Sequence, residues 1–218
     1  MSPDLVRQLQ RFLVIEAGYS VGKIDGIFGP ATLAAFLCYV AGRQLGAIGL
    51  LLARAMIATF RVYDITTPLR IIHFCAQAAH ETGGFRHFVE LGSGDGPDAD
   101  IWDDYLERYD FRADLGNSKG GDGEKTRGRG IFQLTGWFNY RRMAKRIGVD
   151  LVKHPERAAE PEISVLIACI FWTDKGLNPI ADNDNTPLVT KKINGGRNGI
   201  ADRMAKVARG KRAWGLAA

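Results

Sequence analysis

Apolar residues recur at helical spacing along most of the chain, and the interruptions fall at glycine, proline or short polar segments. The first apolar stretch opens with Ser2-Pro3-Asp4, where serine can cap the free amides and proline suits the first helical position. Gly18 ends this helix, Asp25-Gly26 forms a turn, and Gly29-Pro30 opens a second helix. A helical hairpin of this size is not expected to be very stable alone.

Gly42 and Gly46 then mark a boundary between a small N-terminal helical unit (residues 1–43) and a larger domain (residues 44–218). Residues 91–126 are acidic, and their composition predicts loops between the earlier and the later helices of this domain. The expected helices of the larger domain lie near 45–61, 69–82, 136–147, 160–175 and 199–212. The pattern therefore predicts a mainly α-helical protein.

Two glutamates at the end of the 69–82 helix are candidates for general acid and base chemistry. Glu81 lies in the last turn, just before Gly83-Gly84, and Glu90 follows nine residues later. The negative end of the helix dipole disfavours a carboxylate there, so an apolar setting would raise the pKa of Glu81. Glu90 precedes a glycine-rich stretch, where a carboxylate should stay ionised. On spacing alone, the alternative is two ordinary surface glutamates.

The 218 residues are 46% apolar, enough to bury the core of one domain with a small appendage. The net charge of +5 is unevenly spread: residues 191–212 hold eight Lys or Arg and one Asp, whereas 90–110 hold eight Asp or Glu and one Arg. A basic C-terminal segment suits an anionic polymer such as nucleic acid or the bacterial envelope. The alternative is a solvated helix.

Three cysteines, at 38, 75 and 169, lie in apolar runs and predict buried thiols, which indicates folding in a reducing compartment. The N-terminus lacks the basic and apolar regions of a secretory signal. The most apolar segment, 45–60, is interrupted by Arg54 and is short for a membrane span. We therefore expect a soluble chain without a membrane span, and a monomer.

Two later segments combine glycine with neutral polar side chains, the groups that a sugar requires. In 127–140, Gly128 and Gly130 permit close backbone approach, and hydrogen-bonding groups follow at Gln133, Thr135 and Asn139. In 191–199, asparagine alternates with glycine, which predicts another loop. Each segment alone could be a turn before a helix.

Metal and nucleic-acid sites find little support. His73, His80 and His87 recur every seven residues, but seven helical residues rise about 10.5 Å, too far for shared ligation. The run 182–185 lacks the glycine and glutamate of a calcium loop. The basic segment carries no recognised nucleic-acid motif. We expect no metal, no cofactor and no nucleic-acid partner.

The N-terminal unit resembles a short helical peptidoglycan-binding domain. The resemblance covers residues 3–40 and rests on Val6-Arg7-Gln8-Leu9-Gln10, Gly18 and the Asp25–Thr32 segment with its DGxFGxxT pattern. It departs at Tyr39-Val40, where the family usually has an aromatic residue followed by Gln. It implies bacterial peptidoglycan as partner. The implied wall-binding residues are Asp25, Gly26, Phe28 and Thr32.

The larger domain resembles the family 19 glycoside hydrolases, which include plant-type chitinases and phage or bacterial endolysins. The order His80-Glu81-Thr82, then GRGxxQLTGxxNY, then INGGxNGxxDR carries the resemblance, over about residues 45–214. It implies that Glu81 is the general acid and Glu90 the base. Thr126, where the family often has Tyr, is a departure. Of the other matching positions, Thr135 would hold the attacking water, Gln133, Asn139, Tyr140 and Asn194 would contact substrate, and Arg203 would support the glutamates.

The two resemblances together imply a lysozyme-like, two-lobed α domain with at most a short β-hairpin, plus the N-terminal unit. They favour an endolysin that hydrolyses peptidoglycan between N-acetylmuramic acid and N-acetylglucosamine, by single displacement with inversion. Such a protein would be made in the host cytoplasm and would act in the periplasm or wall after release. The alternatives are a chitinase, a lytic transglycosylase and a non-enzymatic wall-binding protein.

Overall fold

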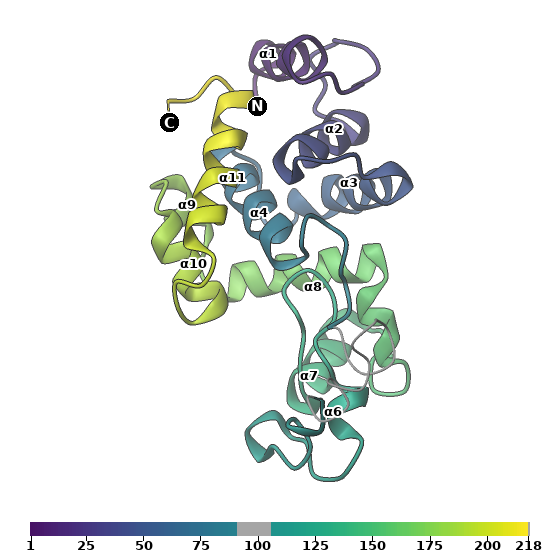
Figure 1. Ribbon diagram of the computed structural model, residues 1–218. Coiled ribbons are helices and arrows are strands. Elements are labelled where there is room, and N and C mark those ends of the chain that lie inside the picture. Colours follow the sequence, from purple (N-terminus) through teal and green to yellow (C-terminus); the bar gives the residue numbers. More distant parts are fainter. Residues whose placement is uncertain (91–105, 218) are drawn as a thin grey trace. The chain divides into compact units, whose positions relative to one another are not determined.

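The computed structural model describes residues 1–90 and 106–217, and within these ranges the chain forms helices joined by loops, without a β-strand (Figure 1). The mainly α prediction is confirmed. The first helices are α1 (Pro3–Arg11), its π-helical continuation η1 (Phe12–Glu16), α2 (Pro30–Ala41), α3 (Gly46–Phe60) and α4 (Pro68–Glu81). The later ones are η2 (Ala113–Leu115), α6 (Asp122–Lys125), α7 (Trp137–Ile147), η3 (Pro155–Ala159), α8 (Pro161–Asp174), α9 (Asn178–Asp182), α10 (Thr186–Asn194) and α11 (Ile200–Ala213).

The chain divides into two compact units. The first contains residues 1–86 and 169–218, and the second contains residues 87–168. The segment 1–43 lies inside the first unit, so the contacts within the chain do not separate it at residue 43. Whether residues 1–43 form a domain of their own stays a prediction.

Residue types at the start of the chain explain the first helix. The Ser2 hydroxyl accepts a hydrogen bond from the Leu5 amide at 3.3 Å, and Pro3 occupies the first turn, as the sequence predicts. The three cysteines, Cys38, Cys75 and Cys169, are buried and free, which confirms the prediction of buried thiols. Burial raises the pKa of each thiol.

The Asp25–Thr32 segment is held by one buried side chain. Gln10 is 1% exposed, and its amide nitrogen donates to Asp25 Oδ1 at 3.0 Å and to Thr32 Oγ1 at 3.0 Å. Its carbonyl oxygen accepts from the Gly26 amide at 2.9 Å. A buried amide needs such partners, so these residues of the motif position the loop.

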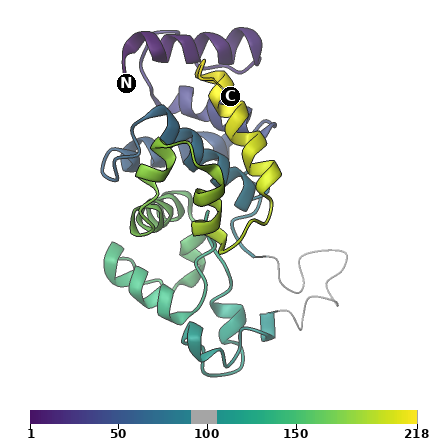
Figure 2. The same cartoon turned by 90° about the vertical axis from the view of Figure 1, so that its left-hand side faces the viewer.

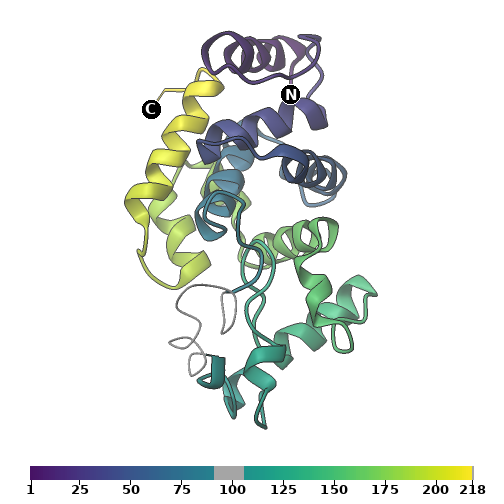
Figure 3. The ribbon, with the colours of Figure 1, turned by 45° about the vertical axis from the view of Figure 1, so that its right-hand side comes forward.

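The N-terminal helices and the C-terminal helix pack together in the first unit. Helix α2 contacts α3 and α11 (Figure 3), and the start of the chain lies beside the end of α11 (Figure 2). The ring of Trp214 is 5.5 Å from that of Phe28 and 6.2 Å from that of Phe36, between centroids. Trp214 thus joins the two ends of the chain in one core.

Helix α4 forms the centre of the first unit, with every residue from Ile71 to Ala79 buried. It packs against α11 and α2. Its Phe74 ring lies between Phe60 and Trp172, at centroid distances of 5.0 and 5.3 Å. Aromatic contacts of this kind bury large areas and fix the helix that ends at Glu81.

The second unit is built around short segments that pair without forming strands. Val89 forms an antiparallel bridge with Arg129, which in turn bridges to Leu134. These bridges fit the prediction of at most a short β-hairpin. Helix α7 follows directly and buries Tyr140 and Met143.

The sequence missed or misplaced some helices. Residues 191–194 were expected in a loop but belong to α10, which Asn185 caps by accepting a hydrogen bond from the Leu188 amide. Within 91–126, residues 91–105 lie outside the described ranges, and α6 and η2 occupy part of the rest. Short helices leave too few apolar positions to show a period.

In the described part of the chain, no single helix has both the length and the apolar character needed to cross a bilayer. The pair α2 and α3, bent by 119°, meets the criterion only when both helices are taken together.

Candidate active site

Glu81 lies at the C-terminal end of α4 and contacts a buried arginine. Arg203, from the first turn of α11, donates from Nη2 to Glu81 Oε1 at 2.6 Å and is 2% exposed. The Glu81 side chain is 19% exposed, so the carboxylate is accessible while its cation is not. The setting of Glu81 is therefore not purely apolar, and Arg203 is placed to pair with the carboxylate that remains after a proton is given up.

Two further side chains fix the arginine. Its Nη1 donates to Gln77 Oε1, and the Gln77 amide nitrogen donates to Thr190 Oγ1 at 3.2 Å. We call Gln77, Glu81, Thr190 and Arg203 the Glu81 cluster. Gln77 lies one helical turn before Glu81, so it faces the same way along α4. Its role was missed because a glutamine within an apolar helix gives no signal of its own.

His80 is held on the neighbouring face. Its Nδ1 lies 2.6 Å from Asp202 Oδ2, and Lys206 Nζ donates to the other oxygen of Asp202 at 2.5 Å. Gly199 has φ +68, and the His80 ring occupies the place that a side chain at this position would take. The glycine of the INGGxNG motif thus makes room for the histidine of the HET motif.

Asn194, at the end of α10, shapes the loop before α11. Its side chain donates to the Asn198 carbonyl at 3.1 Å and accepts from the Gly196 amide at 2.8 Å. The Asn198 carbonyl also accepts from Arg203 Nε at 3.2 Å. The residue predicted to contact substrate therefore also supports the Glu81 cluster.

Glu90 lies in the second unit and is held by neutral donors. Tyr109 Oη donates to Glu90 Oε1 at 2.9 Å, and the Gly128 amide donates to Oε2 at 2.9 Å. The Glu90 amide in turn donates to the Gly128 carbonyl at 2.8 Å. We call Glu90, Tyr109 and Gly128 the Glu90 cluster.

Gly128 allows the close approach that the sequence predicts. A Cβ atom at this position would lie 3.1 Å from Glu90 Oε2 and 2.5 Å from Gln133 Oε1. A side chain here would displace both polar groups. Tyr109, in contrast, was not identified from the sequence, because it lies in the acidic stretch outside every motif.

The QLTG segment forms a tight turn next to Gly128. Gln133 has φ +51, and its side chain donates to the Gly130 carbonyl at 2.9 Å. Thr135 Oγ1 donates to the Gln133 carbonyl at 2.9 Å, and Asn139 donates to the Thr135 carbonyl at 2.8 Å. Gln133 and Thr135 thus lie in one turn of the second unit, and Asn139, at the start of α7, is hydrogen-bonded to that turn.

Two residues that were predicted to contact a ligand have buried side chains. Tyr140 is 0% exposed; its hydroxyl donates to the Arg127 carbonyl at 2.9 Å and accepts from Arg129 at 2.9 Å, so it supports the turn instead of facing substrate. Thr32 is 2% exposed and bonds Gln10, so it does not face a wall polymer. Arg203, which was expected to support the glutamates, is also buried and contacts Glu81.

The other predicted wall-binding residues, and the aspartates once considered for metal binding, contact groups within the chain. Asp25 is exposed but uses its carboxylate on Gln10 and on the Ile27 amide, and Phe28 packs on Trp214. Their contact with wall stays a prediction. The aspartates of the 182–185 run are ion-paired, Asp182 with Arg70 and Asp184 with Lys211. Among residues 1–90 and 106–217, no three His, Cys, Asp or Glu side chains gather as metal ligands.

Comparison with known proteins places this fold and these motifs in one family. The family pattern described as class I chitinase, of glycoside hydrolase family 19, matches residues 52–201. A Haemophilus influenzae protein described as a glycosyl hydrolase family 19 domain-containing protein is 34% identical over 149 residues, which cover 60% of this chain and 72% of that protein. The chain belongs to glycoside hydrolase family 19.

Other relatives agree but are longer or more distant. An endochitinase of Arabidopsis thaliana is 28% identical over 180 residues, covering 80% of this chain; the match spans 58% of that protein, less than two thirds of its length. Chitinase C from Streptomyces griseus has a TM-score of 0.64 at 19% identity, over 84% of this chain and 92% of that one. A class IV chitinase from Zea mays gives 0.59 at 17% identity, over 85% and 92%. The structural likeness confirms the lysozyme-like α fold.

Proposed function

We propose that this chain is an endolysin that hydrolyses the glycan strand of bacterial peptidoglycan, with muramidase activity. The observation that carries the proposal is the peptidoglycan-binding-like segment at residues 3–40, which packs in the same compact unit as Glu81. A family 19 glycosidase with that segment needs a substrate that both parts recognise. Bacterial peptidoglycan is such a substrate.

The proposed reaction is a single displacement with inversion. Glu81 donates its proton to the glycosidic oxygen as the bond to the anomeric carbon breaks, and Arg203 stabilises the carboxylate that is left. Glu90 takes a proton from the water that attacks the anomeric carbon from the opposite face. Inversion requires the two carboxyl groups to lie roughly 6.5–9.5 Å apart in the reacting complex.

The QLTG segment would position water and sugar. Thr135 would orient the attacking water, while Gln133, Asn139 and Asn194 would bond the hydroxyl and acetamido groups of the substrate. Neutral amides suit this task because they both donate and accept hydrogen bonds. We expect a monomer that acts at the cell wall, and a C-terminal segment attracted to anionic envelope.

The deciding experiment is mass spectrometry of the products from purified peptidoglycan, with chitin oligomers in parallel. Muropeptides with reducing N-acetylmuramic acid ends would support the proposal. Products with 1,6-anhydro ends would make the protein a lytic transglycosylase, and no cleavage of either substrate would leave a binding protein.

A chitinase is the second candidate, because the Arabidopsis relative and both solved relatives are chitinases. It predicts rapid cleavage of N-acetylglucosamine oligomers and none of peptidoglycan. The same experiment therefore decides between the two substrates.

A further inference from the structure

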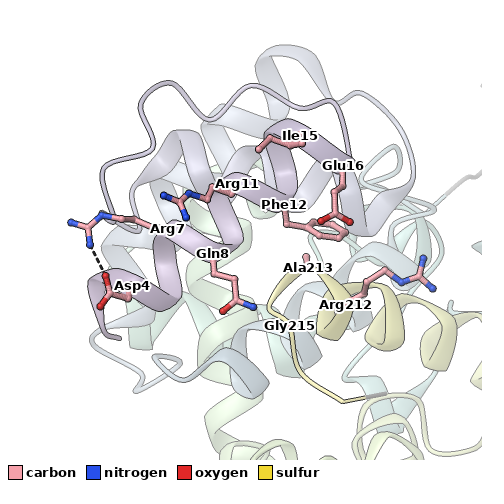
Figure 4. A pocket seen from close by; sticks show the side chains of 10 residues that line it. All are labelled: Asp4, Arg7, Gln8, Arg11, Phe12, Ile15, Glu16, Arg212, Ala213 and Gly215. Atoms are coloured by element: carbon pink, nitrogen blue, oxygen red, sulfur yellow. Dashed lines mark hydrogen bonds and ion pairs between the residues drawn. The ribbon is translucent and has the colours of Figure 1, made fainter.

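The first unit contains a cavity of about 660 Å³ away from the Glu81 cluster, between α1 with η1 and the end of α11 (Figure 4). Arg11 and Glu16 reach it from the first helical segment, and Arg212 reaches it from the last helix. None of the Asp25–Thr32 residues lines it. The cavity is thus separate from the motif that carries the wall-binding resemblance.

Three of the five charged side chains at this cavity have no ion-pair partner in the described part of the chain. Arg7 is paired with Asp4 at 2.7 Å. In contrast, the exposed side chains of Arg11, Glu16 and Arg212 form no hydrogen bond or ion pair with any other described residue. Two free guanidinium groups and one free carboxylate therefore line one cavity.

Apolar side chains lie between these charges. Ile15 is 74% exposed, and the half-buried Phe12 ring lies in the same wall. A neutral glycan would leave both arginines unpaired, and a uniformly anionic polymer would meet the Glu16 carboxylate. A short peptide with carboxylates, an amine and alkyl side chains matches every one of these groups.

We propose that this cavity binds the peptide stem of peptidoglycan, an inference that rests on the proposed function. Arg11 and Arg212 bind its carboxylates, Glu16 binds its amine, and Ile15 and Phe12 contact its alkyl groups. The buried Gln10 network then has a structural role: it holds the loop, while the cavity beside it recognises the wall.

The test measures binding of the full chain to insoluble peptidoglycan by co-sedimentation. The Glu81→Gln background prevents cleavage during the measurement. Sacculi with intact peptides are compared with glycan strands from which an amidase has removed the peptides. We expect about tenfold weaker binding to the stripped strands, and a loss of most binding to sacculi at high salt.

Substitutions then locate the site. Arg11→Ala/Arg212→Ala should lower the affinity for sacculi about tenfold and leave binding to stripped strands unchanged. The control, Lys23→Ala/Arg54→Ala, removes the same charge from exposed positions outside the cavity and should bind as the parent does. Ile15→Ser, at an exposed position, should weaken binding about threefold. Circular dichroism checks that each variant is folded.

Several results would overturn the proposal. Equal losses in the arginine variant and in the control would mean that binding follows net charge, and equal binding to sacculi and stripped strands would mean that the glycan alone is recognised. These results are distinct from failure of the proposed function. If wild-type protein releases reducing muropeptides while the arginine variant binds fully, only the cavity assignment fails; if no muropeptides appear, the function fails regardless of binding.

Discussion

The two units hold their candidate catalytic carboxylates by different means. In the first unit, Glu81 is paired with Arg203, a buried cation 122 residues away in sequence. In the second unit, Glu90 accepts hydrogen bonds from the Gly128 amide and the Tyr109 hydroxyl, both neutral. One carboxylate depends on a charge brought in by the tertiary fold, and the other depends on local backbone geometry.

The same contrast extends beyond the site. In the first unit, Asp184 is paired with Lys211 and His73, and Asp202 with Lys206 and His80. In the second unit, Asp122 accepts from the Trp137 ring and from the Ser118 and Lys119 amides. Ion pairs of the second unit such as Arg112–Asp114 are exposed and local.

This difference indicates how each of the two clusters can fail. A long-range ion pair is lost when either partner is removed, and the remaining buried charge is costly. An amide cradle has no charge to lose and fails when the turn changes or when one donor is removed. The following substitutions test the contrast.

Removal of the buried cation should have the largest effect. Arg203→Met leaves the Glu81 carboxylate and the Gln77 carbonyl without their donor, so we expect a loss of about 3–5 kcal/mol in the free energy of unfolding. Urea denaturation followed by circular dichroism measures it. The double variant Glu81→Gln/Arg203→Met should recover part of the loss, because no unpaired carboxylate remains. A single variant as stable as wild type would contradict the role of the pair.

Loss of either carboxylate should abolish most catalysis. Glu81→Gln and Glu90→Gln should each lower kcat at least about a hundredfold on peptidoglycan, because each removes one general acid or base. The matched control Glu162→Gln changes an exposed glutamate of α8 and should leave kcat unaffected. If Glu90→Gln stays active while Glu81→Gln does not, the reaction needs no base, and the inverting mechanism is excluded.

Much of the fold could be predicted from local sequence. The cap at Ser2, the end of α4 at Glu81 and the main helices follow from helical periodicity and from glycine and proline positions. Helices α9 and α10 were missed because five and nine residues with proline near their starts give almost no periodic signal. The domain boundary at residue 43 was predicted from two glycines, but Trp214 of the larger predicted domain packs against Phe28 and Phe36 of the N-terminal segment.

The candidate site residues could be named from the sequence only where a motif or a spacing indicated them. Glu81 and the QLTG residues came from motifs and Glu90 from its spacing to Glu81, whereas Gln77 and Tyr109 gain their roles from contacts that the sequence does not place. Tyr140 shows the opposite error: a polar residue inside a motif was assigned to substrate, but it is buried beneath the turn. Helical periodicity predicts which apolar residues share a buried face, but it does not predict which polar groups contact each other.

Removal of the neutral hydroxyl that donates to Glu90 should have a smaller effect. Tyr109→Phe removes one hydrogen bond to the carboxylate and leaves the Gly128 amide in place, so kcat should fall about tenfold with KM nearly unchanged. Steady-state kinetics on peptidoglycan separates the two constants. Since the side chain is only half-buried, the melting temperature should change little. A large loss of stability with normal kcat would show that Tyr109 supports the fold and not the base.

The smallest effect tests whether the buried His73 makes the first unit sensitive to mild acid. His73 is 0% exposed, with Nε2 at 2.8 Å from Asp184 and Nδ1 without a partner among the described residues. Burial lowers the pKa of His73 despite the opposing effect of Asp184, and Lys211 lowers it further. Below about pH 6.5 an unfolded histidine therefore binds a proton that the folded one does not. The free energy of unfolding should then decrease as pH decreases, by at most about 1.4 kcal/mol per pH unit. Hydrogen bonds from Trp137 and two amides lower the pKa of Asp122 despite burial, so this carboxylate stabilises the second unit at neutral pH and loses that contribution only as pH falls below about 3.8. Urea denaturation between pH 7.5 and 5 should show the decline in wild type and in the exposed control His154→Gln, but not in His73→Gln. An undiminished slope in His73→Gln would place the acid sensitivity elsewhere and remove this part of the contrast between the units.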